Sequence, residues 1–231
     1  MSDKKVHEHV ESNDVLVKAQ GFWAKFQKQI ITVFTAIVVI VAGWLAYQNF
    51  IVKPKAEKAQ DIIFQAQQYF QQDSLKLALN GDGVNKGFLY IISNYSGTPI
   101  GNLAKYYAGV SYLKTGEFAN AVKYLKDFST DAKQIQMMAY GALGDAYSEL
   151  KNNAEAIESY KKAAATLEKD EVNASEYLFR AALLSELSGK TKEAVDLYKE
   201  LKEKFPTTEK GLQADKYIYR LSIEPNDLSV K

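Results

Sequence analysis

The side chains that most often carry out catalysis or bind transition metals are almost absent from this chain. It has 231 residues, no cysteine and two histidines, His7 and His9, which lie within the first ten positions. The rest of the chain therefore lacks the imidazole and thiol groups of Ser-His and Cys-His nucleophiles and of most zinc sites. His7-Glu8-His9 provides two imidazoles without further ligands. We expect neither an enzyme nor a bound metal or cofactor.

Two further classes of function find little support in the composition. A membrane-bound hydrolase with a serine and a lysine would need a motif that the chain lacks, and chance Ser and Lys pairs are expected in so lysine-rich a sequence. The 29 Lys and Arg nearly balance the 28 Asp and Glu. A near-zero net charge argues against a general nucleic-acid binder.

One segment has the length and composition of a membrane span. Residues 29–52 form 24 consecutive positions without a charge, and at about 1.5 Å per helical residue they exceed the roughly 30 Å hydrocarbon core. Aromatic residues flank both ends, as at membrane interfaces. A cleaved signal peptide would have a shorter apolar region ending in small residues. The sequence predicts an uncleaved transmembrane helix.

The orientation of this helix follows from lengths more than from charges. Lysines flank both ends, at 18, 25 and 28 and at 53, 55 and 58, so the positive-inside rule is nearly tied. The long segment after the span crosses a membrane largely regardless of its charge, whereas a short N-terminal tail commonly stays inside. We expect a single-pass protein whose N-terminal tail lies in the cytoplasm and whose following domain lies outside it.

The tail before the span is mixed in charge but not featureless. Its acidic and basic residues nearly balance, so it is not a polybasic lipid-binding arm. Apolar residues recur at helical spacing, which predicts a short amphipathic helix that lies at the inner face or runs directly into the span; they are Val15, Leu16, Ala19, Phe22, Trp23 and Phe26.

The segment after the span contains an internal repeat. A small residue, an aromatic three later and an alanine nine beyond it recur with an offset of 35 residues, at Gly109-Tyr112-Ala121 and Gly144-Tyr147-Ala156. Variants of the same pattern follow at Ala182-Ser185-Ala194 and precede at Ala66-Tyr69-Ala78. This is the signature of the tetratricopeptide repeat, a pair of antiparallel helices with small residues where the helices cross closely.

The repeat predicts an all-α fold in which the membrane helix precedes a solenoid of about four helix pairs and a capping helix. Turns are expected at Gly116, at Lys151-Asn152-Asn153 and at Gly189. We expect helices over 56–80, 84–95, 100–114, 117–128, 133–150, 153–168, 173–188, 191–204 and 208–222. The predicted domains are the tail with its amphipathic helix (1–28), the membrane helix (29–52), the tetratricopeptide domain (53–222) and a polar C-terminal tail (223–231).

Two stretches carry a more specific resemblance. AQQYFQQDSLKLALNGDG, followed by GFLYIISNYSGTPIGNLAKYYAGVSYL, is similar to the Bacteroidetes form of the ancillary SecYEG translocon subunit (YfgM-like) family. The C-terminal KFPTTEKGLQADKYIYRL also resembles the last repeats of periplasmic proteins that coordinate processes at the outer membrane. The first resemblance implies a bacterial inner-membrane protein with a cytoplasmic N-terminus and a periplasmic domain. It also implies association with the Sec translocon and with a membrane-anchored periplasmic chaperone of the prolyl-isomerase type. Exported client chains are a further possible partner.

The positions that could bind a partner follow from the repeat register. Tetratricopeptide arrays bind along the concave face of their first helices. There we expect a partly apolar site formed by Leu103, Tyr106, Val110, Leu113, Asp145, Phe179 and Leu183, although these side chains could equally pack on neighbouring helices. Within the bilayer, small residues allow close helix contact, and the candidates are Ala36, Ala42, Gly43 and Ala46.

Two alternative functions remain open from the sequence. An organellar import receptor would also join an anchor to a tetratricopeptide domain, but its carboxylate clamp needs converging Lys, Asn and Arg residues. Among the concave positions of the three later repeats, Lys114 is the one base, beside several acids. The other alternative is a general adaptor for cell-envelope assembly. Which partner binds, and whether the domain dimerises, does not follow from these residues.

Overall fold

The chain forms two compact units, residues 1–54 and 55–231. The computed structural model describes the backbone of residues 3–223 and the side chains of residue 17 and residues 20–223. Within 3–223 the regular structure is helical, apart from one isolated antiparallel bridge between Gly81 and Lys86. The predicted all-α class is therefore confirmed. The side chains of His7 and His9, and the predicted tail from residue 224 onward, lie outside the described residues.

The N-terminal unit consists of one long helix. α1 extends from Asp3 to Tyr47, and the π-helical turn η1 follows from Gln48 to Val52. The helix expected around residue 15 thus runs into the apolar segment without a break. The helical run 20–71 contains a window long and apolar enough to cross a membrane, and none of that window is buried. A core helix of the same composition would be covered by other elements.

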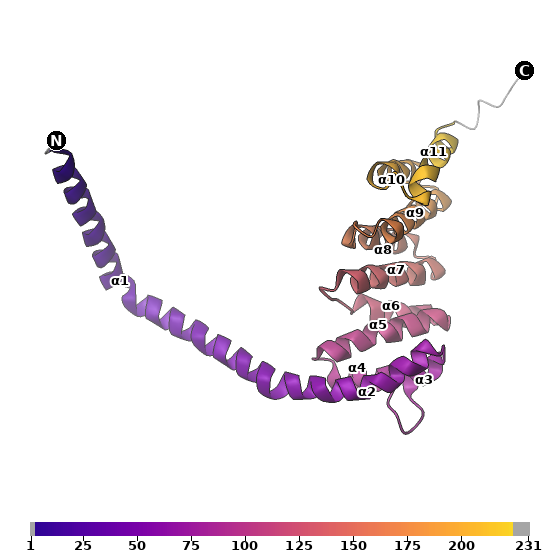
Figure 1. The fold of residues 1–231 in the computed structure, drawn as a ribbon, viewed down its shortest axis with the longest axis horizontal. Helices are drawn as coiled ribbons and strands as arrows, with labels where there is room; N and C mark the ends of the chain where they lie inside the picture. The colour runs from indigo at the N-terminus through magenta and orange to yellow at the C-terminus, as the bar shows by residue number, and fades with distance from the viewer. Residues whose placement is uncertain (1–2, 224–231) are drawn as a thin grey trace, which may run out of the picture. The chain divides into compact units, whose positions relative to one another are not determined.

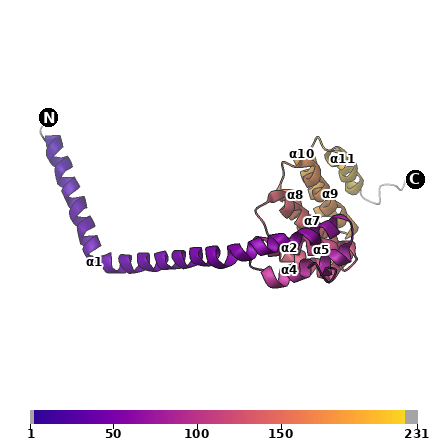
Figure 2. The same cartoon turned by 60° about the horizontal axis from the view of Figure 1, so that its bottom comes forward.

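The C-terminal unit is a stack of helices that follow one another in chain order (Figure 1). Figure 2 views this stack from the end formed by α2, α4 and α5. The helices are α2 (Lys53–Gln71), α3 (Leu75–Asn80), α4 (Phe88–Tyr95), α5 (Pro99–Lys114), α6 (Phe118–Lys126), α7 (Lys133–Glu149), α8 (Asn153–Thr166), α9 (Glu171–Leu187), α10 (Thr191–Lys204) and α11 (Glu209–Ser222).

Three helix pairs have the predicted repeat geometry: α5 with α6, α7 with α8 and α9 with α10. We call α5, α7, α9 and α11 the first helices, and α6, α8 and α10 the second helices. A methyl group on Gly109 would lie 2.5 Å from Leu125 Cγ, and one on Gly144 would lie 2.6 Å from the ring of Tyr160. The first and second helices therefore cross as closely as the small residues predicted. The intervening turns contain Gly116, Lys151 and Gly189, all with positive φ.

The first, irregular pair differs from the prediction. A single helix was expected over 56–80, but α2 ends at Gln71 and α3 begins at Leu75. Asp73 between them has a φ of +56°, and the Ser74 amide donates to the Tyr69 carbonyl, so the chain turns back on itself. The expected helix 84–95 begins only at Phe88.

The late start of α4 has a local cause in the loop before it. Asp82 Oδ1 accepts hydrogen bonds from the backbone amides of Val84 and Asn85, at 2.9 and 2.6 Å, and Asp82 Oδ2 accepts one from the Tyr69 hydroxyl at 2.6 Å. These bonds hold the backbone in a turn rather than a helix, as expected of an aspartate at such a position. They also hold the pKa of Asp82 below its ordinary value.

Buried side chains form three successive clusters along the stack. The cluster at α2–α5 includes Ile63 and Phe88, that at α5–α7 includes Leu125 and Leu143, and that at α8–α11 includes Tyr198. Each repeat thus buries its apolar face mainly against its neighbours, as in other solenoids.

Candidate functional site

The predicted binding residues on α5 lie side by side but are partly covered. Tyr106, Val110 and Leu113 are half-buried and pack against the α5–α7 core cluster, while Leu103 is half-buried one turn before Tyr106. The ring centroids of Tyr106 and Phe128 lie 5.5 Å apart, and burial raises the pKa of Tyr106 to about 12. These four side chains therefore keep part of their surface exposed, and Tyr106, Val110 and Leu113 use the rest to pack against the neighbouring repeat.

The predicted residues on α9 lie deeper than the sequence indicated. Phe179 is only 8% exposed, and its ring centroid lies 6.0 Å from that of Tyr198 and 5.3 Å from that of Tyr217. Leu183 packs against the same cluster. Phe179 is thus a core residue that joins α9 to α10 and α11, and it presents little surface. Met138 on α7 and Leu187 on α9, at other concave positions of the repeat register, are instead exposed.

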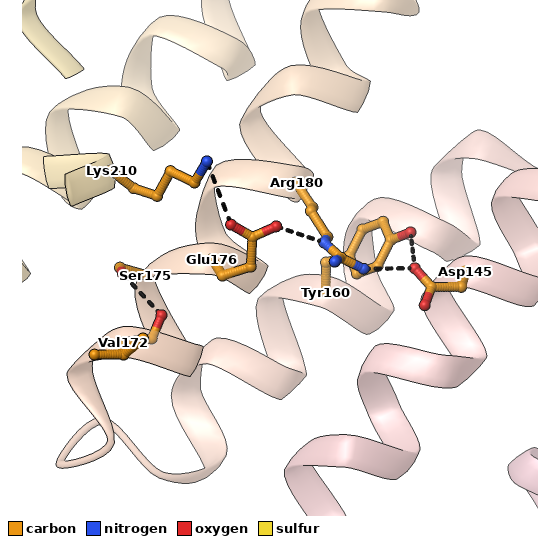
Figure 3. A network of polar contacts seen from close by, with 7 residues as sticks. All are labelled: Asp145, Tyr160, Val172, Ser175, Glu176, Arg180 and Lys210. Atoms are coloured by element: carbon orange, nitrogen blue, oxygen red, sulfur yellow. Dashed lines mark hydrogen bonds and ion pairs between the residues drawn. The ribbon is translucent and has the colours of Figure 1, made fainter. Parts of the chain in front are cut away.

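Asp145 lies in a polar network rather than in an apolar patch (Figure 3). Its Oδ1 accepts hydrogen bonds from the Tyr160 hydroxyl at 2.7 Å and from Arg180 Nη1 at 3.0 Å. Arg180 Nε also donates to Glu176 at 2.9 Å, and Lys210 Nζ lies 3.5 Å from the other oxygen of Glu176. The network crosses from α7 through α9 to α11. It therefore ties three successive first helices together.

A second network repeats this arrangement one repeat later. The Tyr198 hydroxyl donates to Glu186 Oε2 at 3.2 Å, and Arg220 Nη2 donates to both oxygens of Glu186 at 2.7 and 2.8 Å. In each network a tyrosine of a second helix and an arginine of the following first helix meet the same carboxylate. We call these two arrangements the Tyr-acid-Arg staples.

The sequence contains a signal for the staples that the repeat pattern alone did not reveal. Tyr177-Leu-Phe-Arg180 on α9 and Tyr217-Ile-Tyr-Arg220 on α11 share the spacing Tyr-x-x-Arg. Each guanidinium lies over the tyrosine ring three residues earlier, 5.8 Å from the Tyr177 centroid and 5.3 Å from the Tyr217 centroid. Stacking on a ring orients the planar guanidinium toward its carboxylate.

The pKa directions agree with these contacts. Burial raises the pKa of the Tyr160 hydroxyl, and the adjacent Asp145 charge raises it further. Burial likewise raises the pKa of Tyr198, with a contribution from Glu186. Burial alone would raise the pKa of Glu176, but its hydrogen bond with Arg180 and the charges of Arg180 and Lys210 lower it overall. Glu176 therefore stays ionised, and the hydroxyls of Tyr160 and Tyr198 stay neutral, at physiological pH.

One surface depression lies away from these residues. It has a volume of about 730 Å³ and lies between α8 and α10, with Lys161, Lys192, Asp196 and Glu200 in its walls. Its mixed charges are those of a solvated surface. Among the described residues no three His, Cys, Asp or Glu side chains are grouped so as to hold a metal ion.

The predicted membrane contact residues lie on α1. Ala36, Ala42, Gly43 and Ala46 are exposed, and a methyl group on Gly43 would meet nothing within 4 Å. These positions are therefore available to another helix, and close contact there remains a prediction.

Comparisons with known proteins agree with this geometry. Residues 139–165 and 176–208 each match a family model that is described as a tetratricopeptide repeat. Among solved structures, the chain is similar to a Podosopora anserina kinesin light chain with nearly identical TPR-like repeats. The two share 15% identity over 72% of this chain and 86% of that one, with a TM-score of 0.50, which shows a common fold alone. No curated protein matches the chain. Residues 20–143, more than half of the sequence, match the tetratricopeptide repeat-like domain family, so the chain belongs to that family.

Proposed function

We propose that this protein is a membrane-anchored scaffold that binds other proteins of the cell envelope through its first helices. Tetratricopeptide arrays act as protein-interaction scaffolds. The observation that carries the proposal is the exposed apolar surface of α1 in a chain that also contains a solenoid. A helix with such a surface needs lipid or another protein around it, so the solenoid would work beside a membrane.

The partners we propose come from the family resemblance. They are the Sec translocon and a membrane-anchored periplasmic chaperone of the prolyl-isomerase type, so the scaffold would assist exported proteins as they leave the translocon. This places the N-terminus in the cytoplasm and the solenoid in the periplasm. Support for the two attachment points is separate: small residues on α1 for a contact in the bilayer, and the first helices for a contact outside it.

The residues proposed for the outer contact are refined by burial. Leu103, Tyr106, Val110 and Leu113 on α5 keep part of their surface free, and Met138 and Leu187 extend the apolar positions onto α7 and α9. Phe179 is left out because its loss would open the core. Exposed apolar side chains of this kind dominate many protein interfaces.

The experiment is affinity purification of the full chain in mild detergent, with identification of co-purifying membrane proteins. Met138→Ser with Leu187→Ser should reduce recovery of the periplasmic chaperone while the helical content stays unchanged. Val84→Ser with Val172→Ser is the matched control, because these valines are exposed but lie outside the predicted contact positions. Absence of both translocon subunits and chaperone from the wild-type sample would refute the proposed partners.

A further inference from the structure

A π-helical turn marks the end of the apolar segment in the N-terminal unit. η1 extends from Gln48 to Val52, and the Lys53 amide donates to the Gln48 carbonyl five residues earlier, rather than four as in an α-helix. Trp44 and Lys53 are nine residues apart, which in an uninterrupted α-helix would place them on opposite faces. The extra residue of the π turn rotates Lys53 by about 100° toward the side of Trp44 and Gln48.

Aromatic and polar side chains gather beside this turn as a result. An open depression of about 630 Å³ has Trp44, Asn49, Phe50 and Lys53 among its lining residues. Lys53 Nζ donates to Asn49 Oδ1 at 3.0 Å, which keeps the ammonium group on this side of the helix. An ammonium has three N–H donors. Two donors of Lys53 therefore remain for an acceptor from outside the described chain.

The sequence around the depression places it at the surface of a membrane. Val52 is the last residue of the uncharged run, and Lys53 is the first charged residue after it. Trp44 and Phe50 are 59% and 76% exposed. Exposed aromatic rings at the end of a membrane helix, and lysines that extend from it, lie at the level of the lipid headgroups. Where α1 crosses a bilayer, headgroups therefore surround this depression.

The groups in the depression match the chemistry of a phospholipid. A lipid phosphodiester is an anion that accepts hydrogen bonds, while Lys53 provides a cation with N–H donors and Trp44 provides its indole N–H. The exposed ring surfaces of Trp44 and Phe50 can contact the upper part of the acyl chains. A zwitterionic headgroup contains its own cation, which competes with Lys53, whereas an anionic headgroup does not. The depression therefore favours an anionic lipid.

We infer that Trp44, Asn49 and Lys53 bind the phosphodiester of an anionic glycerophospholipid in the leaflet at this end of α1. Trp44 and Lys53 contact the lipid, and Asn49 positions the ammonium group through its hydrogen bond. The bound headgroup fixes the depth of α1 in the bilayer. The inference rests on the membrane anchor of the proposed function, so the test also reports on that anchor.

Fluorescence of Trp44 tests the inference in the full chain. The chain has two tryptophans, so Trp23→Phe leaves Trp44 as the one indole. This variant is placed in vesicles of zwitterionic phosphatidylcholine that contain a small fraction of phosphatidylglycerol or of phosphatidylcholine with brominated acyl chains, which quench a nearby indole. The brominated anionic lipid should bind beside Trp44 on the order of fivefold more strongly than the zwitterionic one, the ratio expected for one lysine at the headgroup level.

Substitutions of Lys53 show whether this preference comes from the depression. In the same Trp23→Phe chain, Lys53→Gln should abolish the preference and Lys53→Arg should keep it. Lys58→Gln is the matched control, because it removes the same charge from an exposed lysine outside the depression and should leave the preference unchanged. Circular dichroism checks that each variant is folded.

The outcomes separate the inference from the proposed anchor. Equal binding of the two lipids, or equal effects of Lys53→Gln and Lys58→Gln, would overturn the lipid site while quenching of Trp44 by both lipids still supported the anchor. No quenching by either brominated lipid would refute the membrane anchor and the lipid site together.

Discussion

Arg180 Nη1 lies 3.0 Å from Asp145 Oδ1, and this bond joins the first helices of two successive repeats across 35 residues of sequence. Arg220 has the same relation to Glu186 on the next pair of first helices. Both staples found among the described residues lie in the half of the stack from α7 to α11. At α5 and α6, Leu125 occupies the position that Tyr160 and Tyr198 occupy later, so the hydroxyl needed for a staple is missing there.

The first prediction concerns this pair. Arg180→Ala should lower the free energy of unfolding by about 1–2 kcal/mol, because Asp145 and Glu176 each lose a charged hydrogen-bond donor while remaining half-buried. Urea denaturation of the full chain in mild detergent, followed by circular dichroism, measures it. Lys162→Ala, at an exposed position on α8, is the control and should change stability by less than about 0.5 kcal/mol. Equal stability of the two variants would mean that the staple contributes nothing.

The close crossing of α7 and α8 gives the second prediction. Gly144→Leu should destabilise the C-terminal unit by about 1–3 kcal/mol or more, since even its first carbon would lie 2.6 Å from the Tyr160 ring. The displaced ring would also lose its hydrogen bond to Asp145. Gly97→Leu is the control, because a methyl group there meets nothing within 4 Å. Thermal melting compares the two, and an unchanged melting temperature for Gly144→Leu would contradict the close crossing.

Glu176 gives a prediction for acid pH. Its pKa is lower in the folded chain than its ordinary value of 4.5, so its stabilising effect is complete above that pH and is lost as the pH falls through the folded pKa. The difference in stability between the wild-type chain and Glu176→Gln should therefore be constant from pH 7 to about pH 5 and shrink at lower pH. Denaturation at several pH values tests this, and a difference that grows on acidification would show that the sign is wrong.

The orientation in the membrane can be tested with reporters. A reporter that is active only outside the cytoplasm, fused after Lys231, should be active, because the proposed topology places the solenoid in the periplasm. The same reporter fused before residue 1 should be inactive and serves as the control. Activity of a cytoplasm-only reporter after Lys231 would reverse the proposed topology.

The sequence by itself determined the helical solenoid and its register, and it identified the segment that could span a membrane. Small residues at a fixed offset of 35 positions, such as Gly109 and Gly144, report a close helix crossing because a larger side chain cannot fit there. An uncharged run of 24 residues indicates an apolar helix that could span a membrane, because few other structures accommodate so long an apolar segment. Both signals are local, so one sequence carries them in full.

The tertiary structure alone decided which side chains of the first helices are free. The repeat register places both Met138 of α7 and Phe179 of α9 on the concave face. Tyr217 of α11 covers Phe179, whereas Met138 stays exposed. The turn at Asp73, which divides the predicted helix 56–80, depends on contacts that no periodicity encodes. Likewise, Tyr160, Asp145 and Arg180 meet only because three helices from two repeats converge. Periodicity shows which face of a helix is apolar. Which side chain covers a given position depends on the neighbouring helices, and the packing of the whole stack determines where those helices lie.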